Sequence, residues 1–577
     1  MDKYSMEITK KEFDSFFNRE YFIEYGYFAF KREKLSTVLD EDYKEFEEEY
    51  QTTVSDMFSR KLWSMESVNE YIKENNIMFN KDFVTIPIEM HCAKSEYTKR
   101  KYKFINLYNY IRISDHLIEN SKVVENLFLK DIHSTSKFLT SSFSANNIRK
   151  KKDVNSKNKK YILKTDLSNF FYSIYTHTIP WVMIGKKEAK KRVKKEFSNK
   201  LDSLIQNSQD GETKGVPTGS ILTRFIVEMY QLKIDQDLSK KLNIHFHRYV
   251  DDYNFYFNKD IEKEKVLKEI YSIYSDVELQ LNENKIKVTS FPEHTSHSIV
   301  IDDYFKSYHY LTVSIIEDSE LDSNKKASKI VKIIYKFIDY YSALSREYVI
   351  KQPPYFAIEI YLLEIKEMDI EVYKHLLEKD FLFELFAFFL LEMKHLQYFL
   401  NFIEKIFVDS DNNLKRTFKK YESILDEKLK EYFEGGFQVE TSYLLTLRLI
   451  YPYFFYKKEI LSNIIENGDS FNAIMAYKIL FNYSPTDEIY AIDASISRIK
   501  KYGKLMKETR KEEIFSFQNE NFIFEYEIGR LYKNNKNIKK QFTQSDKKLF
   551  TESLKKGNEI KNFYLDMINE NIKIFLK

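Results

Sequence analysis

Two segments in the first half of the chain alternate apolar and polar positions, which is typical of β-strands. In KYILKTD (160–166), every second side chain would point to the same face. The aromatic segment FHRYVDDYNFYF (246–257) is interrupted by two adjacent aspartates, which predicts a strand, a turn and a strand. Between them, SILTRFIVEMYQLKIDQDL (220–238) has apolar residues three or four positions apart, which predicts a helix. Residues 100 to 300 therefore combine helices and strands.

From about residue 310 the apolar positions follow helical spacing. Examples are ASKIVKIIYKFIDYYSAL (327–344), FAIEIYLLEIKEM (356–368) and TSYLLTLRLIYPYFF (441–455). Proline and glycine separate these segments, which favours antiparallel helix pairs in an irregular solenoid without a fixed period. We expect an α+β domain over residues 1–305 and an all-α domain over residues 306–577.

Composition narrows the classes of function only slightly. The 91 basic and 88 acidic residues leave a net charge of +3, so any surface that attracts phosphates must be local, as in the basic runs 149–160 and 186–195. A single cysteine, Cys92, excludes an internal disulfide and a cysteine-based metal site, and fits a reducing compartment.

We expect a soluble, cytoplasmic protein with no membrane partner. The first residues, MDKYSMEITKKEFD, lack the apolar core of a signal peptide. The most apolar run, FLFELFAFFLLEM (381–393), is shorter than the ~20 residues that span a bilayer and contains Glu384. A buried helix is the better interpretation of this run.

The acidic pair Asp251–Asp252 is the first candidate for chemistry. Asp is common in turns because it bonds its own backbone, so a turn without function is the ordinary interpretation. If the strand ending at Asp166 pairs with strand 245–250, however, three carboxylates would meet. Their repulsion calls for a cation, and oxygen ligands suit Mg²⁺. Two Mg²⁺ ions held by Asp166, Asp251 and Asp252 could stabilise the attacking and leaving oxygens of a phosphoryl transfer.

A glycine-rich loop, KGVPTGS (214–220), lies between these segments. The chain has only 11 glycines, yet Gly211, Gly215 and Gly219 fall close together around Pro217. Glycine permits positive φ and close approach of a ligand to the backbone. An ordinary turn into the following helix is the alternative interpretation.

In chain order, DLSNFF (166–171), GVPTG (215–219), YVDD (249–252) and LQLNENKIKV (279–288) resemble the A, B, C and following motifs of the reverse transcriptase palm. The resemblance implies a fingers–palm fold for residues 1–305. It also implies that Asp166 and Asp251 are the principal metal ligands, with Asp252 in support.

The same resemblance implies a set of nucleotide-binding residues. Phe171 would lie against the sugar and exclude a 2′-hydroxyl, so the substrates would be deoxynucleoside triphosphates. Lys285 would lie near the leaving pyrophosphate. The remaining residues would contact the nucleotide from the loop or from the fingers: Gly215, Pro217, Thr218, Gly219, Arg100 and Lys103. The ordinary alternatives are a core phenylalanine and solvated basic residues.

The chain departs from templated reverse transcriptases at Thr218, where those enzymes usually have Gln, and at Thr223–Arg224, where they have Ser-Pro. No thumb module is recognisable after residue 300. The string DLSNFFYSIYTHTIPWVMIGKKEAK (166–190) resembles the bacterial abortive-infection reverse transcriptases of the AbiK type. That resemblance implies template-independent polymerisation of deoxynucleotides, homo-oligomers, anti-phage defence and a HEAT-like helical C-terminal array. It does not indicate the phage trigger.

Proteins of the AbiK type prime synthesis on one of their own tyrosines, so the single-stranded DNA product is covalently attached to the protein. Their priming tyrosine follows an acidic Leu-Asp-x-x-Tyr pattern. VLDEDYKEF (38–46) matches it and nominates Tyr43. A surface tyrosine on an acidic helix is the alternative.

Two other functions stay open. One is a templated RNA-directed DNA polymerase of the retron or intron type, which would need an RNA partner; Thr218 and the missing thumb speak against it. The other is a non-catalytic helical scaffold with a dead palm. The intact Asp166, Asp251 and Asp252 speak against the scaffold.

Overall fold

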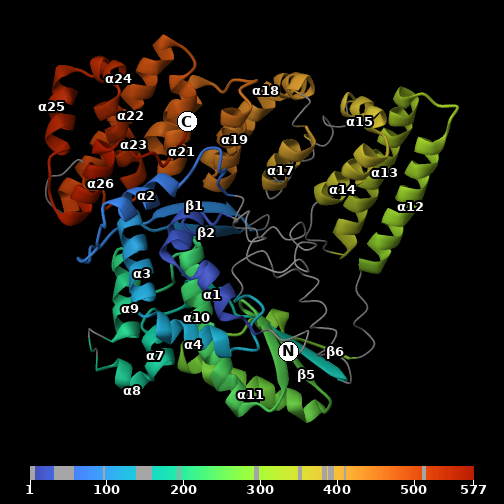
Figure 1. Cartoon of the computed structure of the whole chain (residues 1–577), viewed down its shortest axis with the longest axis horizontal. Helices are drawn as coiled ribbons and strands as arrows, with labels where there is room; N and C mark the ends of the chain where they lie inside the picture. The colour runs from blue at the N-terminus through green and yellow to red at the C-terminus, as the bar shows by residue number, and fades with distance from the viewer. Residues whose placement is uncertain are drawn as a thin grey trace.

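The computed structural model describes only part of the chain in detail. The described residues are 7–30, 57–94, 98–137, 159–191, 193, 196–290, 298–348, 354–379, 386, 396–407, 411–509 and 515–577. Tyr43, most of the basic run 149–160 and most of the apolar run 381–393 lie outside them. The described part consists of a small mixed α/β region and a large set of helices (Figure 1).

A four-stranded antiparallel sheet confirms the predicted strands. Its order is β4 (His245–Tyr249), β5 (Asp252–Phe257), β3 (Tyr161–Thr165) and β6 (Lys287–Ser290). The predicted pairing of strand 161–166 with strand 245–250 was wrong, because β3 pairs with β5 and β6. The outer edge of β4 is instead taken by residues 133–136, so β5 becomes the inner strand of the hairpin.

The helix α10 (Ile221–Lys241) confirms the prediction for residues 220–238. It packs against α4 (Ser121–Lys130), α7 (Thr178–Ile184) and α11 (Asp260–Asp276), so it is surrounded by other elements along most of its length. The rest of the first half adds the hairpin strands β1 (Ile88–Ala93) and β2 (Lys99–Phe104) and the helices α1 (Lys10–Phe16), η1 (Tyr21–Gly26), α2 (Glu66–Glu74), α3 (Leu107–Glu119), α6 (Phe170–Ser173), α8 (Lys186–Ala189), α9 (Phe197–Asn207) and η3 (Glu283–Lys285).

The predicted change to helices is confirmed, since each named element of the described residues after 297 is a helix. In Figure 1 one group of them stands at the right and the others extend along the top to the upper left. No helix in the described part of the chain is both long enough and apolar enough to cross a bilayer. The helices are α12 (Ser298–Glu317), α13 (Ser323–Tyr348), α14 (Pro354–Met368), α15 (Ile370–Leu377), α17 (Leu396–Ile406), α18 (Asp411–Glu434), α19 (Gln438–Ile450), α20 (Lys458–Asn467), α21 (Ser470–Phe481), α22 (Pro485–Thr509), α23 (Phe522–Asn534), α24 (Lys536–Gln541), α25 (Gln544–Ser553) and α26 (Glu559–Asn569).

The hydrophobic core continues from the first half into the C-terminal helices. The Phe471 ring on α21 lies 5.3 Å from the Trp63 ring and 5.4 Å from the Phe104 ring, measured between centroids. The last residues of the chain return to the same region, where the Leu576 N–H donates to the Leu62 carbonyl at 2.8 Å. Burial of large aromatic rings makes this contact a major stabilising one.

The β1–β2 hairpin is held along both of its edges. On the β1 edge, the backbone N–H groups of His91 and Ala93 donate to the side chains of Gln438 and Glu440 on α19, at 2.9 and 3.0 Å. On the β2 edge, the Lys103 N–H donates to the Thr218 carbonyl at 2.6 Å. The hairpin therefore joins the predicted glycine loop to the C-terminal helices.

The Glu440 carboxyl should make the stability of this junction depend on pH. Burial raises its pKa to about 7, so the fold favours the neutral form. The contribution of neutral Glu440 to the free energy of unfolding is complete below the unfolded pKa of about 4.3. It is lost as the pH rises through 7. Glu440→Gln keeps an acceptor for Ala93 without the charge. We expect it to stabilise the protein relative to wild type at pH 8, by on the order of 2–3 kcal/mol more than at pH 5.

Thermal unfolding of both proteins at the two pH values measures this difference. The exposed Glu459→Gln on α20 is the control and should show no such trend. An equal effect of Glu440→Gln at pH 5 and pH 8 would contradict a raised pKa of the Glu440 carboxyl.

Candidate active site

The three predicted carboxylates meet at one end of the sheet. Asp166 directly follows β3, Asp251 lies in the β4–β5 turn and Asp252 begins β5. Because Thr165 pairs with Tyr253, the next position of β3 lies beside Asp252. One oxygen from each carboxylate lies within 4.8 Å of the others. Asp166 therefore lies beside the acidic pair, although the strand next to β3 is β5 and not the predicted strand 245–250.

Mutual repulsion is visible in the ionisation of Asp251. Burial, followed by the negative charges of Asp166 and Asp252, raises the pKa of the Asp251 carboxyl to about 7. The Lys285 ammonium lies 2.7 Å from Asp166 Oδ2, and the Asn282 amide donates to the same oxygen at 3.3 Å. One ammonium does not balance three carboxylates, so the cluster favours an additional cation.

The donor set fits a magnesium ion. All three ligands are carboxylate oxygens, which Mg²⁺ prefers, and the cluster contains no histidine or cysteine. Asp166 is buried whereas Asp252 is exposed, so the cluster opens to solvent on one side. Asp166, Asp251 and Asp252 could therefore hold a metal ion that also binds a phosphate.

The turn between the strands has an uncommon backbone. Val250 has a φ of 56°, in the left-handed region that β-branched residues rarely adopt. Its N–H donates to Ser136 Oγ at 2.8 Å and its carbonyl accepts from Arg248 Nη1 at 2.9 Å. Sequence reasoning missed these supports. Glu228 and Asp235, seven positions apart and therefore on one face of the predicted helix, were the available signal of a buried polar network.

The glycine loop needs its glycines because other parts of the protein approach it closely. Gly215 has a φ of 82°, and a Cβ there would lie 3.3 Å from the Tyr172 carbonyl oxygen. Gly219 has a φ of 128°, and a Cβ there would lie 3.0 Å from the Phe104 ring. Pro217 of the same loop is buried. Positive φ was predicted correctly, and protein groups lie close to both glycines, whereas the approach of a ligand to this backbone stays a prediction.

Two of the other predicted residues lie beside or within this loop. The Val216 N–H donates to the Phe171 carbonyl at 2.9 Å, so Phe171 lies beside the loop. Its side chain is partly buried against the Phe170 ring. Thr218 Oγ1 donates to the Lys101 carbonyl of β2 at 2.9 Å. Their contacts with a nucleotide stay predictions.

Arg100 and Lys103 are not brought together. They lie three positions apart on the regular strand β2, so their side chains point to opposite faces of the hairpin. The Lys103 ammonium lies 3.7 Å from Glu89 Oε1 on its own face. A ligand bound on one face of the hairpin can therefore contact the side chain of only one of these two residues.

A match to one protein-family model agrees with this geometry. Residues 109–315 match the family model of reverse transcriptases (RNA-dependent DNA polymerases), so the chain contains a reverse transcriptase domain. Comparison with curated proteins gives no match. Among solved structures, the chain is similar to apo telomerase from Candida tropicalis with a TM-score of 0.28 and 12% identity, over 54% of this chain and 67% of that chain.

Lys285 should compete with a metal ion for the carboxylates. Removal of its charge in Lys285→Met should tighten Mn²⁺ binding roughly fivefold, because two charges about 4 Å apart and screened by water interact by about 1 kcal/mol. Titration of Mn²⁺ by electron paramagnetic resonance measures the affinity. The exposed Lys287→Met on β6 is the matched control and should bind as wild type does. Unchanged or weaker binding by Lys285→Met would contradict this account of the site.

Proposed function

We propose that the protein is a deoxynucleotide polymerase of the abortive-infection type that acts in bacterial defence against phages. The cluster of Asp166, Asp251 and Asp252 is the observation that carries the proposal. It lies in the reverse transcriptase domain, which implies nucleotidyl transfer, nucleotide substrates and a nucleic acid product.

Each residue of the site has a role in this chemistry. Asp166 and Asp251 would hold two Mg²⁺ ions, with Asp252 in support. Bound Mg²⁺ neutralises the charge of the transferring phosphoryl group and stabilises the attacking and leaving oxygens. Lys285, which is bonded to Asp166, adds positive charge on the side where pyrophosphate leaves. Phe171 limits the sugar to the deoxy form.

The contacts of Thr218 support synthesis without a template. Templated reverse transcriptases usually have Gln at this place. Here the Thr218 hydroxyl donates to the Lys101 carbonyl, and the Tyr172 hydroxyl donates to the same oxygen. The Thr218 side chain therefore binds the loop to the β1–β2 hairpin and is not free to position a template.

Synthesis begins on the protein itself in this proposal. The Tyr43 hydroxyl oxygen forms a bond to the α-phosphorus of a deoxynucleoside triphosphate. The bond from that phosphorus to the bridging oxygen breaks, pyrophosphate leaves, and the phenolic proton passes to water. Later additions use the 3′-hydroxyl of the attached strand. The product is single-stranded DNA covalently bound to the protein.

The C-terminal helices form a HEAT-like array, and the protein acts as a homo-oligomer. Both properties follow from the resemblance of residues 166–190 to the AbiK type. The consecutive packing of α20, α21 and α22 on one another supports a stacked helical array.

A templated RNA-directed DNA polymerase is the second candidate, because the matching family model describes such enzymes. Incubation of the protein with Mg²⁺ and single deoxynucleotides, without template or primer, separates the two candidates on a denaturing gel. We expect a protein-linked ladder that Asp251→Asn abolishes. Product only after addition of RNA would favour the templated enzyme, and no product in either condition would favour a scaffold.

The priming residue is tested in the same assay. Tyr43→Phe should remove the protein-linked ladder, because a phenyl ring has no oxygen to attack the phosphorus. Binding of a fluorescent deoxynucleotide should persist, since the carboxylates remain. Tyr50→Phe, in the same acidic segment, is the control and should retain the ladder. A ladder from Tyr43→Phe would reject Tyr43 as the primer.

A further inference from the structure

We propose that Arg248, Ser136 and Glu228 are positioning residues that hold the β4–β5 turn, and with it the Asp251 carboxylate, in place at the active site. Their effect on catalysis rests on the proposed function. Their effect on the arrangement of the carboxylates can be measured without it.

The turn is fixed on both sides of Val250. Its N–H and its carbonyl are bonded to Ser136 Oγ and to the Arg248 guanidinium, respectively. The left-handed φ of 56° at this residue is unfavourable for valine unless the surroundings determine it. Because Asp251 is the next residue, rotation of the Val250 backbone would move its carboxylate.

Both supports of the turn meet at Glu228 of α10. Ser136 Oγ donates its hydrogen to Glu228 Oε2 at 2.8 Å, which leaves an oxygen lone pair to accept from Val250. Arg248 Nη2 donates to Glu228 Oε1 at 2.7 Å, and Nη1 donates to Oε2 at 3.2 Å. All three side chains are buried, so each bond forms away from competing water. The Glu228 carboxylate thereby orients both groups that hold the turn.

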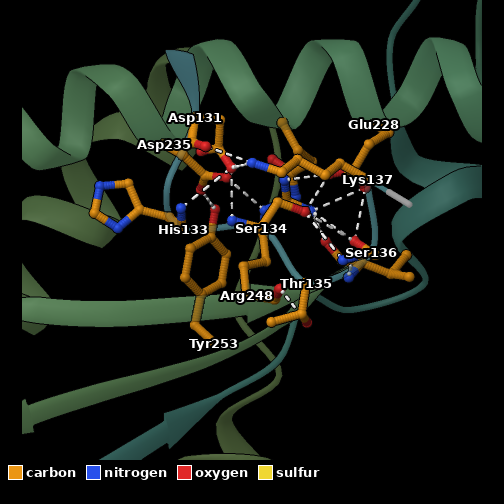
Figure 2. Close-up of polar contacts among 12 residues, drawn as sticks. Asp131, His133, Ser134, Thr135, Ser136, Lys137, Glu228, Asp235, Arg248 and Tyr253 are labelled. Carbon is orange, nitrogen blue, oxygen red and sulfur yellow. Dashed lines mark hydrogen bonds and ion pairs between the residues drawn. The ribbon is translucent and has the colours of Figure 1, made fainter. Parts of the chain in front are cut away.

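A second carboxylate fixes the guanidinium itself. Arg248 Nε donates to Asp235 Oδ2 at 2.7 Å, so carboxylates from two different turns of α10 bind the same guanidinium (Figure 2). The same helix begins at Ile221, two residues after Gly219 of the glycine loop. The network therefore sets the position of Asp251 relative to the loop that would contact the nucleotide.

Ser134 offers a matched control for Ser136. Its hydroxyl also donates to Glu228, and both serines are buried in the segment beside β4 (Figure 2). Ser134 Oγ accepts from the Ser136 N–H at 3.1 Å and lies 3.2 Å from Ser136 Oγ, but only Ser136 of the two serines accepts from the Val250 N–H. Ser134→Ala and Ser136→Ala should therefore lower the melting temperature by similar amounts. Only Ser136→Ala should reduce kcat, by roughly tenfold or more, with the nucleotide KM little changed.

Rescue by glycine separates positioning from general damage to the fold. Glycine adopts positive φ without support. Val250→Gly in the Ser136→Ala background should recover at least part of the lost kcat, although it adds backbone freedom. If Val250→Gly gives no recovery, the positioning role is overturned. A loss of kcat that came only from instability would likewise not be rescued by this substitution.

Mn²⁺ binding followed by electron paramagnetic resonance gives a readout independent of polymerisation. Ser136→Ala should weaken binding severalfold more than Ser134→Ala does. If the wild type makes no product but shows this difference in binding, the proposed function fails and the positioning role stands. If the wild type polymerises and the two serine variants bind Mn²⁺ and turn over alike, the positioning role is overturned.

Discussion

Repulsion among three carboxylates within 4.8 Å of one another is the constraint on which the site depends. Unscreened, it would push the side chains apart or protonate one of them. The fold opposes it by fixing all three backbones at the end of one sheet and by placing Lys285 beside Asp166. Burial, together with the charges of Asp166 and Asp252, raises the pKa of Asp251 to about 7. A bound cation would reduce the repulsion among the carboxylates. The same repulsion that lowers the stability of the fold therefore favours metal binding.

The C-terminal helices are connected to this site through the β1–β2 hairpin. Phe104 of β2 lies close to Gly219 and also packs against Phe471 of α21. Glu440 of α19 binds the opposite edge of the same hairpin. A shift of these helices would therefore reach the glycine loop through packed rings and hydrogen bonds, because packed cores transmit small displacements. In physical terms, the helical half is part of the framework that shapes the site.

The local patterns predicted elements and faces, but not neighbours. Alternation in 161–165 and helical spacing in 221–241 are local, and both elements formed. Which strand lies beside β3 depends on residues 133–136, which cover β4 and carry no periodic signal. The cluster around Asp166 was still predictable, since the order of the motifs brings its members to one sheet end. Arg100 and Lys103 were each predicted to contact the nucleotide, and the two-residue period of a strand places their side chains on opposite faces.

The buried network behind the turn has a composition that stability alone does not explain. Arg248 and Lys137 face the carboxylates of Glu228, Asp235 and Asp131, and burial raises the pKa of Asp235 to about 7 despite its bond to Arg248. Buried ion networks are often no more stable than well-packed apolar side chains. An apolar core, however, has no group to accept the Val250 N–H or to donate to its carbonyl. The network therefore fixes the backbone of the β4–β5 turn, where a displaced carboxylate would disrupt the site, although it adds little stability.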